Sequence, residues 1–310
     1  MKKIVWLLNE HTNDKSEYSP AIYWWYGILE KLGYEVIYYP YENYNPSIFI
    51  EDMKTYKPDF IFHPGYNKIH PEFAELDCEV YIVQSDDDWR FSSFATQWKP
   101  ITNGVISYQN TKQSYVDEGF DPDMVYEALW AFNPNTMLTD LNVEKDIFLS
   151  HVGGLHANRK KLLNEFAQKG YNVTAPSSKM HYERVKNLWA RSKFSLTFTM
   201  SSQGNFRQKK GRIAEIPYFT FMLSEPFKGI EDFYEPEKEI IIFNSVDEAI
   251  DKIKYYDNNP KEYNKVCNAS RKRLISTNTC YHSWDNLMEK IDPDYKKTNI
   301  QDILKNHFNL

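Results

Sequence analysis

The stretch that decides the fold is Arg207-Gln208-Lys209-Lys210-Gly211-Arg212-Ile213-Ala214-Glu215-Ile216-Pro217. It places four cations within six positions of a chain whose formal net charge is -6. An apolar run, residues 218–223, follows at once and predicts a buried strand. Cations at a helix start beside a buried strand suit a bound diphosphate. The alternative is a solvated basic face with a surface ion pair between Arg212 and Glu215, which are three residues apart.

Length and composition indicate a globular protein of two domains. The 310 residues exceed the usual size of one domain, and an apolar content of 42% supplies ample core. A pI of about 5.8 argues against general nucleic-acid binding. Cys78, Cys267 and Cys280 lack metal-like spacing and are expected to be reduced thiols. The apolar run of residues 4–8 is too short for a signal peptide and no stretch approaches a membrane span, so we expect a cytoplasmic location.

Short apolar runs alternate with helical patterns in both halves of the chain. Strands are expected in the first half at residues 4–8, 34–39, 59–63, 80–83 and 104–108, with helices at about 20–32, 48–56 and 111–118. Strands are expected in the second half at residues 146–152, 173–174, 194–200, 219–223 and 239–243, with helices beginning at Asn158, His181, Val246 and Pro260 and a last one after His282. This alternation predicts an α/β protein with two Rossmann-like, doubly wound domains that face each other across a cleft. We expect domains at residues 1–140 and 141–310, with the last helix returning to the first domain.

Four segments of the second half occur in an order that identifies a family. They are Gly153-Gly154 with Arg159 shortly after, Lys210–Pro217, Gly229–Glu239 and Asn278–His282. In the first half, Asp86-Asp87-Asp88-Trp89-Arg90-Phe91 forms an acidic-aromatic motif. Together these segments resemble CgeB-like, group-1-related glycosyltransferases with the GT-B fold. The resemblance covers residues 146–290 well and the rest of the chain loosely.

The resemblance implies a metal-independent, hexosyltransferase-like enzyme without a cofactor. Its second domain would bind a UDP- or dTDP-sugar, and its first domain would bind the acceptor. The donor-binding residues implied are Gly153, Gly154, Arg159, Lys210, Arg212 and Glu215. Lys210 and Arg212 would stabilise the diphosphate leaving group, and Glu215 would accept hydrogen bonds from the ribose. For Arg159 the alternative is a solvated cation in the first turn of a helix.

The sequence departs from the larger group-1 pattern at Arg207. That pattern has a second glutamate eight residues before the first, where it holds the sugar. With Arg207 in its place, neither the mode of sugar recognition nor a retaining mechanism is implied. The loop of residues 201–205 is a candidate replacement because it offers polar groups on flexible backbone.

Two candidates for a catalytic base follow strands of the first half. His11 lies after the first expected strand, where some GT-B enzymes place a catalytic histidine, and its alternative is a structural or exposed histidine. Asp87 lies in a triple aspartate whose mutual repulsion would raise a carboxyl pKa, and the alternative is a helix cap. Asp86, Trp89 and Arg90 would bind the acceptor. No metal site is expected, although such a triplet also occurs in the other large glycosyltransferase fold.

The main interpretation is a glycosyltransferase that moves a sugar from a nucleotide-sugar to a hydroxyl of a glycan, a protein or a small molecule. One rival is a non-catalytic protein that binds nucleotides or sugars, and another is a sugar-phosphate epimerase of the same architecture. A third rival is a DNA-modifying glycosyltransferase, which the acidic balance disfavours.

Overall fold

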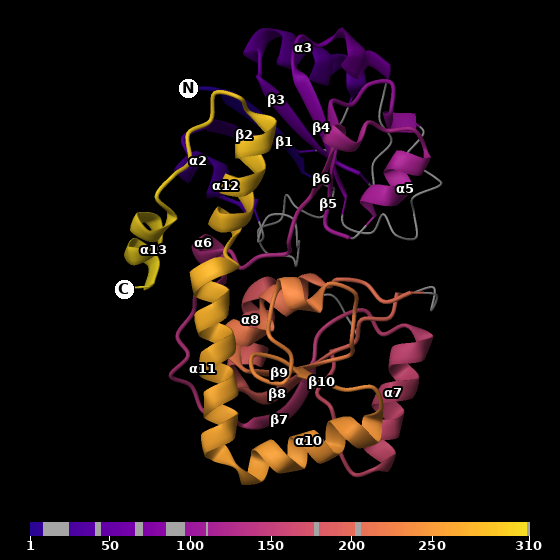
Figure 1. Ribbon diagram of the computed structural model, residues 1–310, viewed down its shortest axis with the longest axis vertical. Helices are drawn as coiled ribbons and strands as arrows, with labels where there is room; N and C mark the ends of the chain where they lie inside the picture. The colour runs from indigo at the N-terminus through magenta and orange to yellow at the C-terminus, as the bar shows by residue number, and fades with distance from the viewer. Residues whose placement is uncertain are drawn as a thin grey trace.

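The fold consists of two parallel β-sheets, one in each half of the chain (Figure 1). A computed structural model describes residues 1–8, 25–40, 45–65, 71–84, 97–109, 111–176, 180–201 and 206–308. The strands of the first sheet are β1 (Lys3–Leu8), β2 (Glu35–Pro40), β3 (Phe60–Pro64), β4 (Glu79–Gln84), β5 (Gly104–Ser107) and β6 (Val125–Glu127). Their order is β2-β1-β3-β4-β5-β6, and every pairing is parallel. The predicted α/β fold class is confirmed.

Buried strands and short helices make up the first domain. Ile4, Val5, Trp6 and Leu7 on β1 are all at most 1% exposed, as expected of a parallel strand covered on both faces. The helices are α2 (Ile28–Lys31), α3 (Pro46–Tyr56), α5 (Lys112–Asp117), α6 (Pro134–Met137) and the 3₁₀ turns η1 (Pro71–Glu75) and η2 (Pro122–Met124). Asn45 caps α3 by accepting a hydrogen bond from the Ser47 N–H at 3.0 Å.

The second sheet has its switch point at β7. Its strands are β7 (Ile147–His151), β8 (Ser192–Thr197), β9 (Phe221–Ser224) and β10 (Ile241–Ile242), in the order β10-β9-β8-β7. Thr174 pairs with the free side of β7, since its N–H donates to Leu149 O at 2.9 Å and its carbonyl accepts from the His151 N–H at 3.0 Å. The chain therefore builds outward from β7 in both directions, and the loops at its carboxyl end are the place where such sheets bind ligands.

Helices cover both faces of this sheet. They are α7 (Ala157–Gln168), α8 (Tyr182–Arg191), η3 (Gly211–Ala214), α9 (Ile216–Phe219), η4 (Ile230–Asp232), α10 (Val246–Asn258) and α11 (Pro260–Thr277). The helix expected to begin at Asn158 begins at Ala157 instead, and Asn158 accepts a hydrogen bond from the Arg159 N–H at 2.9 Å.

The prediction of a strand over the whole run of residues 218–223 is wrong in its first half. Tyr218 and Phe219 belong to α9, and β9 begins only at Phe221. Tyr218 packs on Phe132 with ring centroids 4.6 Å apart, and Phe219 packs on Trp189 at 5.5 Å. A short helix buried on all sides has the same continuous apolar pattern as a buried strand, so periodicity does not separate them.

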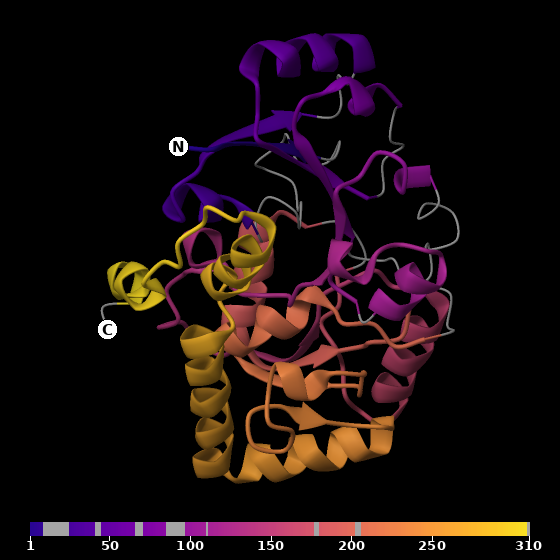
Figure 2. The same cartoon turned by 45° about the horizontal axis from the view of Figure 1, so that its top comes forward.

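The last two helices pack on the first domain although they follow the second in sequence. Figures 1 and 2 show α12 (Cys280–Ile291) beside the first sheet and α11 along the second, with α13 (Ile300–Phe308) farther out. Trp284 of α12 lies 5.1 Å from Trp6 and 5.3 Å from Phe62 between ring centroids. The two segments that cross between the domains also pair, because the Phe132 N–H donates to Asn278 O at 2.9 Å and the Cys280 N–H to Phe132 O at 2.8 Å.

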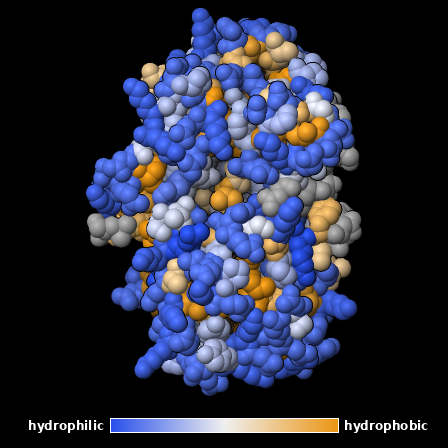
Figure 3. All heavy atoms as spheres, in the orientation of Figure 1, coloured by the Kyte–Doolittle hydropathy of each residue, from blue (hydrophilic) through white to orange (hydrophobic). Residues whose placement is uncertain are grey.

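Apolar side chains gather in clusters inside the molecule rather than over the face seen in Figure 3, where hydrophilic residues predominate. The largest cluster runs from one face of the first sheet through α12 to the residues under α8 and α9, so it is shared by both domains. Within the described ranges, no helix is both long enough and apolar enough to cross a membrane.

A buried ion pair fastens the end of α12 to the first strand, and its removal gives a stability prediction. Asp292, whose side chain is 3% exposed, accepts from Lys2 Nζ at 2.5 Å and from the Tyr34 hydroxyl at 2.8 Å. Desolvation raises the pKa of this carboxyl, but the hydrogen bonds from Lys2 and Tyr34 outweigh it and leave the pKa below its usual value. We expect Asp292→Asn to lower the free energy of unfolding at pH 7 by about 1–3 kcal/mol, measured by urea titration.

The effect of Asp292→Asn on the free energy of unfolding should depend on pH, because the folded-state pKa of Asp292 is depressed. A carboxyl with a depressed folded pKa stabilises the fold above its unfolded pKa of about 3.9, and this contribution is lost as the pH falls through the folded value. The free energies of unfolding of wild type and Asp292→Asn should therefore become more similar below about pH 4. Asp294→Asn is the control, because Asp294 also contacts Lys2, at 2.9 Å, but its side chain is 80% exposed. Equal losses in both variants would contradict the expectation.

Candidate functional site

The candidate site lies where the chain leaves β7 and β8. Gly153 has a φ of +148°, a backbone conformation that residues with a Cβ rarely adopt. A Cβ added there would lie 2.9 Å from Cζ and Nη2 of Arg212. The guanidinium group of Arg212 therefore lies directly against the Gly153 backbone. Two residues predicted to bind one ligand, 59 positions apart in the printed sequence, are neighbours in the fold.

Arg159 joins the loops that follow β7 and β8. Its Nη1 donates to Gly154 O at 2.8 Å and its Nη2 donates to Met200 O at 3.2 Å. The residue is only 4% exposed, so the alternative of a solvated first-turn cation does not hold. Burial, and then the neighbouring Arg212, lower the pKa of the Arg159 guanidinium to about 10. Through its hydrogen bonds to backbone carbonyls, Arg159 fixes the two loops of the site, and it also contributes a positive charge there.

Two arginines of the site each have a guanidinium nitrogen that lacks an acceptor within the described ranges. Nε of Arg159 and Nε of Arg212 are both buried, and neither has a hydrogen-bond acceptor in the described part of the chain. His151 adds no charge, because burial lowers its pKa to about 3. Its Nδ1 lies 3.0 Å from Leu196 O and so carries the proton. A buried N–H of a cationic group that lacks an acceptor favours an anionic ligand.

Lys210 lies at the edge of this cluster. It is half-buried, and its Nζ donates to Oε1 of Gln208. Desolvation, then Arg159 and Lys210, lower the pKa of His156, which follows the glycine turn. A Cβ added at Gly154 would lie 2.9 Å from Nε2 of His156. The structure thus brings five of the six predicted donor-binding residues to one place at the end of β7.

Glu215 is the sixth, and its side chain is hydrogen-bonded to a residue of α8. Its side chain is fully buried and its Oε1 accepts from the Tyr182 hydroxyl at 2.8 Å. Burial and then the charge of Glu215 raise the pKa of the nearby Cys280 thiol. The expected alternative of a surface ion pair with Arg212 is wrong, because the turn η3 ends before Glu215 and its carboxylate lies with Tyr182 while Arg212 lies with Gly153.

Arg207 pairs with a carboxylate that the sequence did not single out. Its Nη1 lies 3.3 Å from Oε1 of Glu225 and donates to Thr199 Oγ1 at 3.2 Å. Oε2 of Glu225 accepts from the Thr199 N–H at 2.8 Å, so Glu225 holds the segment after β8. The signal that could have found it is its position directly after the buried strand β9. Of the proposed loop of residues 201–205, Ser201 is buried and residues 202–205 lie outside the described residues.

The predicted catalytic and acceptor-binding residues lie outside the described residues. They are His11, Asp86, Asp87, Trp89 and Arg90. The strands that precede them in sequence, β1 and β4, both pair in parallel with β3, so the carboxyl ends of these two strands lie at the same edge of the first sheet. In the described ranges, no group of three or more His, Cys, Asp or Glu side chains is arranged to hold a metal ion.

Comparisons with known proteins agree with this architecture. Residues 151–289 match the family described as glycosyl transferase-like. The Anabaena protein Alr3699/HepE, crystallised with UDP-glucose, superposes with a TM-score of 0.64 at 9% identity, over 94% of this chain and 100% of that chain. Sucrose-phosphate synthase (tll1590) from Thermosynechococcus elongatus gives a TM-score of 0.62 at 10% identity, over 94% and 99%. A glycosyltransferase from Rickettsia africae ESF-5 gives 0.59 at 13% identity, over 94% and 99%.

No curated protein matches the chain in sequence. At identities this low, the similarity to solved structures indicates the fold alone. The family match concerns the second domain only. The chain is therefore a two-domain protein with the GT-B fold, and its residues 151–289 match a glycosyl transferase-like family.

Proposed function

We propose that the protein is a glycosyltransferase that moves a sugar from a UDP- or dTDP-sugar to a hydroxyl group of an acceptor. The observation that carries the proposal is the pair of arginines Arg159 and Arg212, each with a buried Nε that has no acceptor among the described residues, beside the Gly153 turn in the segment that matches a glycosyl transferase-like family. A nucleoside diphosphate is an anion whose charge grows as the glycosidic bond breaks. Fixed cations at that position stabilise the transition state more than the ground state.

The donor residues divide into separate roles in this proposal. Arg212 and Lys210 contact the diphosphate, and the backbone of Gly153 and Gly154 approaches it closely because no Cβ intervenes. Glu215 accepts hydrogen bonds from the ribose. Its carboxylate is fully buried here, so a ribose reaches it only after the neighbouring groups move. HepE shares this fold and was crystallised with UDP and with UDP-glucose, which supports a UDP-linked donor.

The first domain binds the acceptor in this proposal. His11 or Asp87 removes the proton of the acceptor hydroxyl, and Asp86, Trp89 and Arg90 orient the acceptor. We further propose that the protein is CgeB-like, needs neither a metal ion nor a cofactor, and acts in the cytoplasm. The strand order of the first sheet supports acceptor binding by the first domain. The order reverses at β1, and ligands bind beyond the carboxyl ends of strands at such a point.

A nucleotide titration tests the proposal directly. UDP at 100 times its dissociation constant should stabilise the protein by about 2.7 kcal/mol, which corresponds to a rise in melting temperature of about 4 °C for a chain of this length. UDP, dTDP, GDP and ADP are compared with free glucose, which should produce no shift. Failure of every nucleotide at millimolar concentration would refute the proposal.

A second experiment separates the enzyme from a non-catalytic binding protein. The sugar nucleotide that gives the largest thermal shift is incubated with the protein alone and with a panel of hydroxyl acceptors, and nucleotide release is measured. A transferase releases nucleotide faster when its acceptor is present. A binding protein gives the thermal shift without release under any condition.

A further inference from the structure

One side chain of the first domain forms a paired hydrogen bond with the backbone of the basic segment in the second. Oε1 of Gln109 accepts from the Lys209 N–H at 3.0 Å, and Nε2 of Gln109 donates to Lys209 O at 3.1 Å. The primary amide therefore pairs with both polar groups of one backbone residue, as a neighbouring strand would. Gln109 is 4% exposed and Lys209 is 5% exposed, so water does not readily replace these bonds.

The chain holds Gln109 in place from its own side. The Ser107 hydroxyl, at the end of β5, donates to Gln109 O at 3.0 Å and accepts from the Gln109 N–H at 3.1 Å. The same hydroxyl oxygen lies 2.8 Å from Thr111 Oγ1. The amide is thus presented by a tight polar turn at the carboxyl end of a buried strand.

The indole group of Trp130, also in the first domain, donates a hydrogen bond to the same carbonyl. Trp130 Nε1 donates to Lys209 O at 3.2 Å. The Trp130 ring stacks on Tyr108 with ring centroids 4.5 Å apart, and the Tyr108 hydroxyl accepts from Trp25 Nε1 at 2.8 Å. Three hydrogen bonds therefore join the buried aromatic core of the first domain to the backbone of Lys209.

The other side of the basic segment is fixed by the second domain. The Gln208 N–H donates to Thr199 O at 2.9 Å, and a bridge pairs Arg207 with Met200. The segment that leads into Lys210 and Arg212 is therefore held between the residues after β8 on one side and Gln109 on the other. Its position depends on both domains being in place.

We propose that Gln109 is a positioning residue that couples the first domain to the anion-binding segment of the second. By fixing the Lys209 peptide groups, Gln109 sets the place of Lys210 and Arg212 relative to the Gly153 turn. Binding of an anionic donor and docking of the two domains then stabilise each other. The part of this inference that concerns the donor rests on the proposed function, whereas the interdomain contact does not.

The contact itself is tested without any ligand. Gln109→Met keeps the length of the side chain and removes both hydrogen bonds to Lys209. Amide hydrogen exchange across residues 206–212, measured by mass spectrometry in the ligand-free protein, should quicken about tenfold or more at the Lys209 amide. Gln113→Met is the matched control, because Gln113 lies on α5, is exposed, and bonds Asp117 within its own helix at 2.8 Å. Unchanged exchange in Gln109→Met would overturn the proposal.

The coupling to the anion site is tested with UDP as the probe. We expect Gln109→Met to weaken UDP binding about tenfold by calorimetry, while Gln113→Met binds as wild type does. Gln109→Glu is the second variant, in case the first does not fold: its ionised carboxylate still accepts from the Lys209 N–H but repels Lys209 O, and binding should weaken similarly. UDP affinity within twofold of wild type in a folded Gln109 variant would overturn the positioning role. Failure of wild type to bind any nucleotide would refute the proposed function instead, and hydrogen exchange would still decide on the contact.

Discussion

Replacing Arg212 with alanine is expected to lower kcat/KM for the sugar-nucleotide donor by about 10²–10³-fold, the usual cost of removing one preorganised donor from a developing negative charge. The guanidinium lies against the Gly153 backbone, and its buried Nε has no acceptor among the described residues. Alanine removes the charge and leaves a gap beside the glycine turn. The measurement is the initial rate of nucleotide release at several donor concentrations.

Two further variants separate the role of Arg212 from a general loss of charge. Arg212→Lys keeps the charge and loses the planar fork, so its activity should lie between those of wild type and Arg212→Ala. Arg191→Ala removes an arginine of the same domain that is bound to Asp146 at the surface, with Nε–Oδ1 at 2.8 Å, and should act as wild type does. A loss in Arg191→Ala as large as in Arg212→Ala would contradict the assignment.

The sequence predicted the layered architecture because that architecture depends on local pattern. Buried parallel strands give continuous apolar runs, and each run found at the sequence level corresponds to a strand or a bridge in the described structure. The failures are equally physical. β6 (Val125–Glu127) was missed because three residues carry no periodicity, and α9 was taken for a strand because it is buried on all sides. The hydrophobic pattern of a sequence therefore indicates which segments are buried more reliably than it indicates their backbone conformation.

The candidate site was predicted less completely than the fold. The Gly153 turn and Arg212 were found because glycine and a cluster of cations are visible along the chain, and the resemblance gave them a shared ligand. The burial of Glu215 against Tyr182 could not be predicted, because it depends on how α8 packs against α9, whose first turn Glu215 precedes. The charge run also did not reveal that Arg207 is already paired with Glu225.

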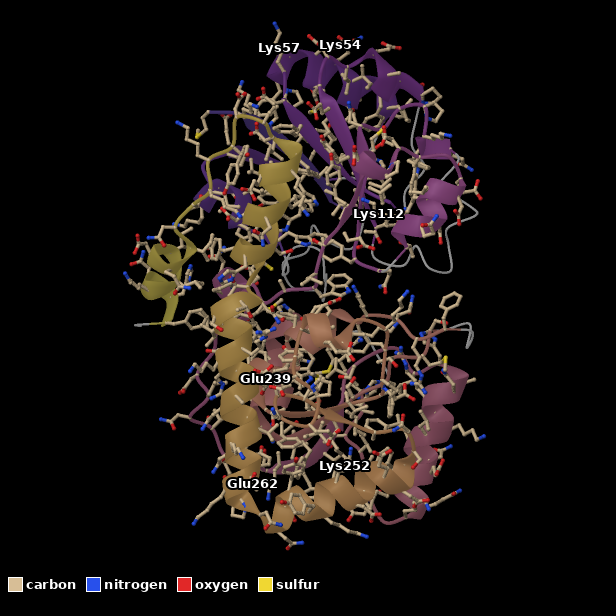
Figure 4. The ribbon with its side chains drawn as sticks, viewed as in Figure 1. Lys54, Lys57, Lys112, Glu239, Lys252 and Glu262 are labelled. Atoms are coloured by element: carbon tan, nitrogen blue, oxygen red, sulfur yellow. The ribbon has the colours of Figure 1, made fainter. Side chains whose placement is uncertain are left out.

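The interdomain contact was invisible to sequence reasoning for a different reason. Gln109 is a single neutral amide, 100 residues from its partner Lys209, and it belongs to no motif, although Lys209 lies in the basic stretch. The role of Gln109 becomes visible only in the folded protein, where the carboxyl end of β5 contacts the segment after β8. Figure 4 shows that charged side chains such as Lys54 and Lys57 lie at the end of the first domain farthest from the second. They are suited to serve as exposed controls, whereas Gln109 is not a surface residue.

The second large effect is expected for stability, at Trp284. This side chain is 1% exposed and lies between Trp6 and Phe62, with centroid distances of 5.1 and 5.3 Å. Trp284→Ala should lower the free energy of unfolding by about 3–5 kcal/mol, the sum of lost apolar contact and the cavity left behind. Urea unfolding followed by circular dichroism measures this loss.

The same variant tests whether α12 joins the two domains into one cooperative unit. α12 follows the second domain in sequence and packs on the first, so loosening Trp284 should let the first domain unfold before the second. The wild type should show one transition, and Trp284→Ala should show two. Lys290→Ala is the matched control, because Lys290 is exposed on the same helix and should change the free energy of unfolding by less than about 0.5 kcal/mol. A single transition in Trp284→Ala, shifted no further than in Lys290→Ala, would mean that the domains are held together elsewhere, and the paired crossing segments at Phe132 and Cys280 would then be the next contact to break.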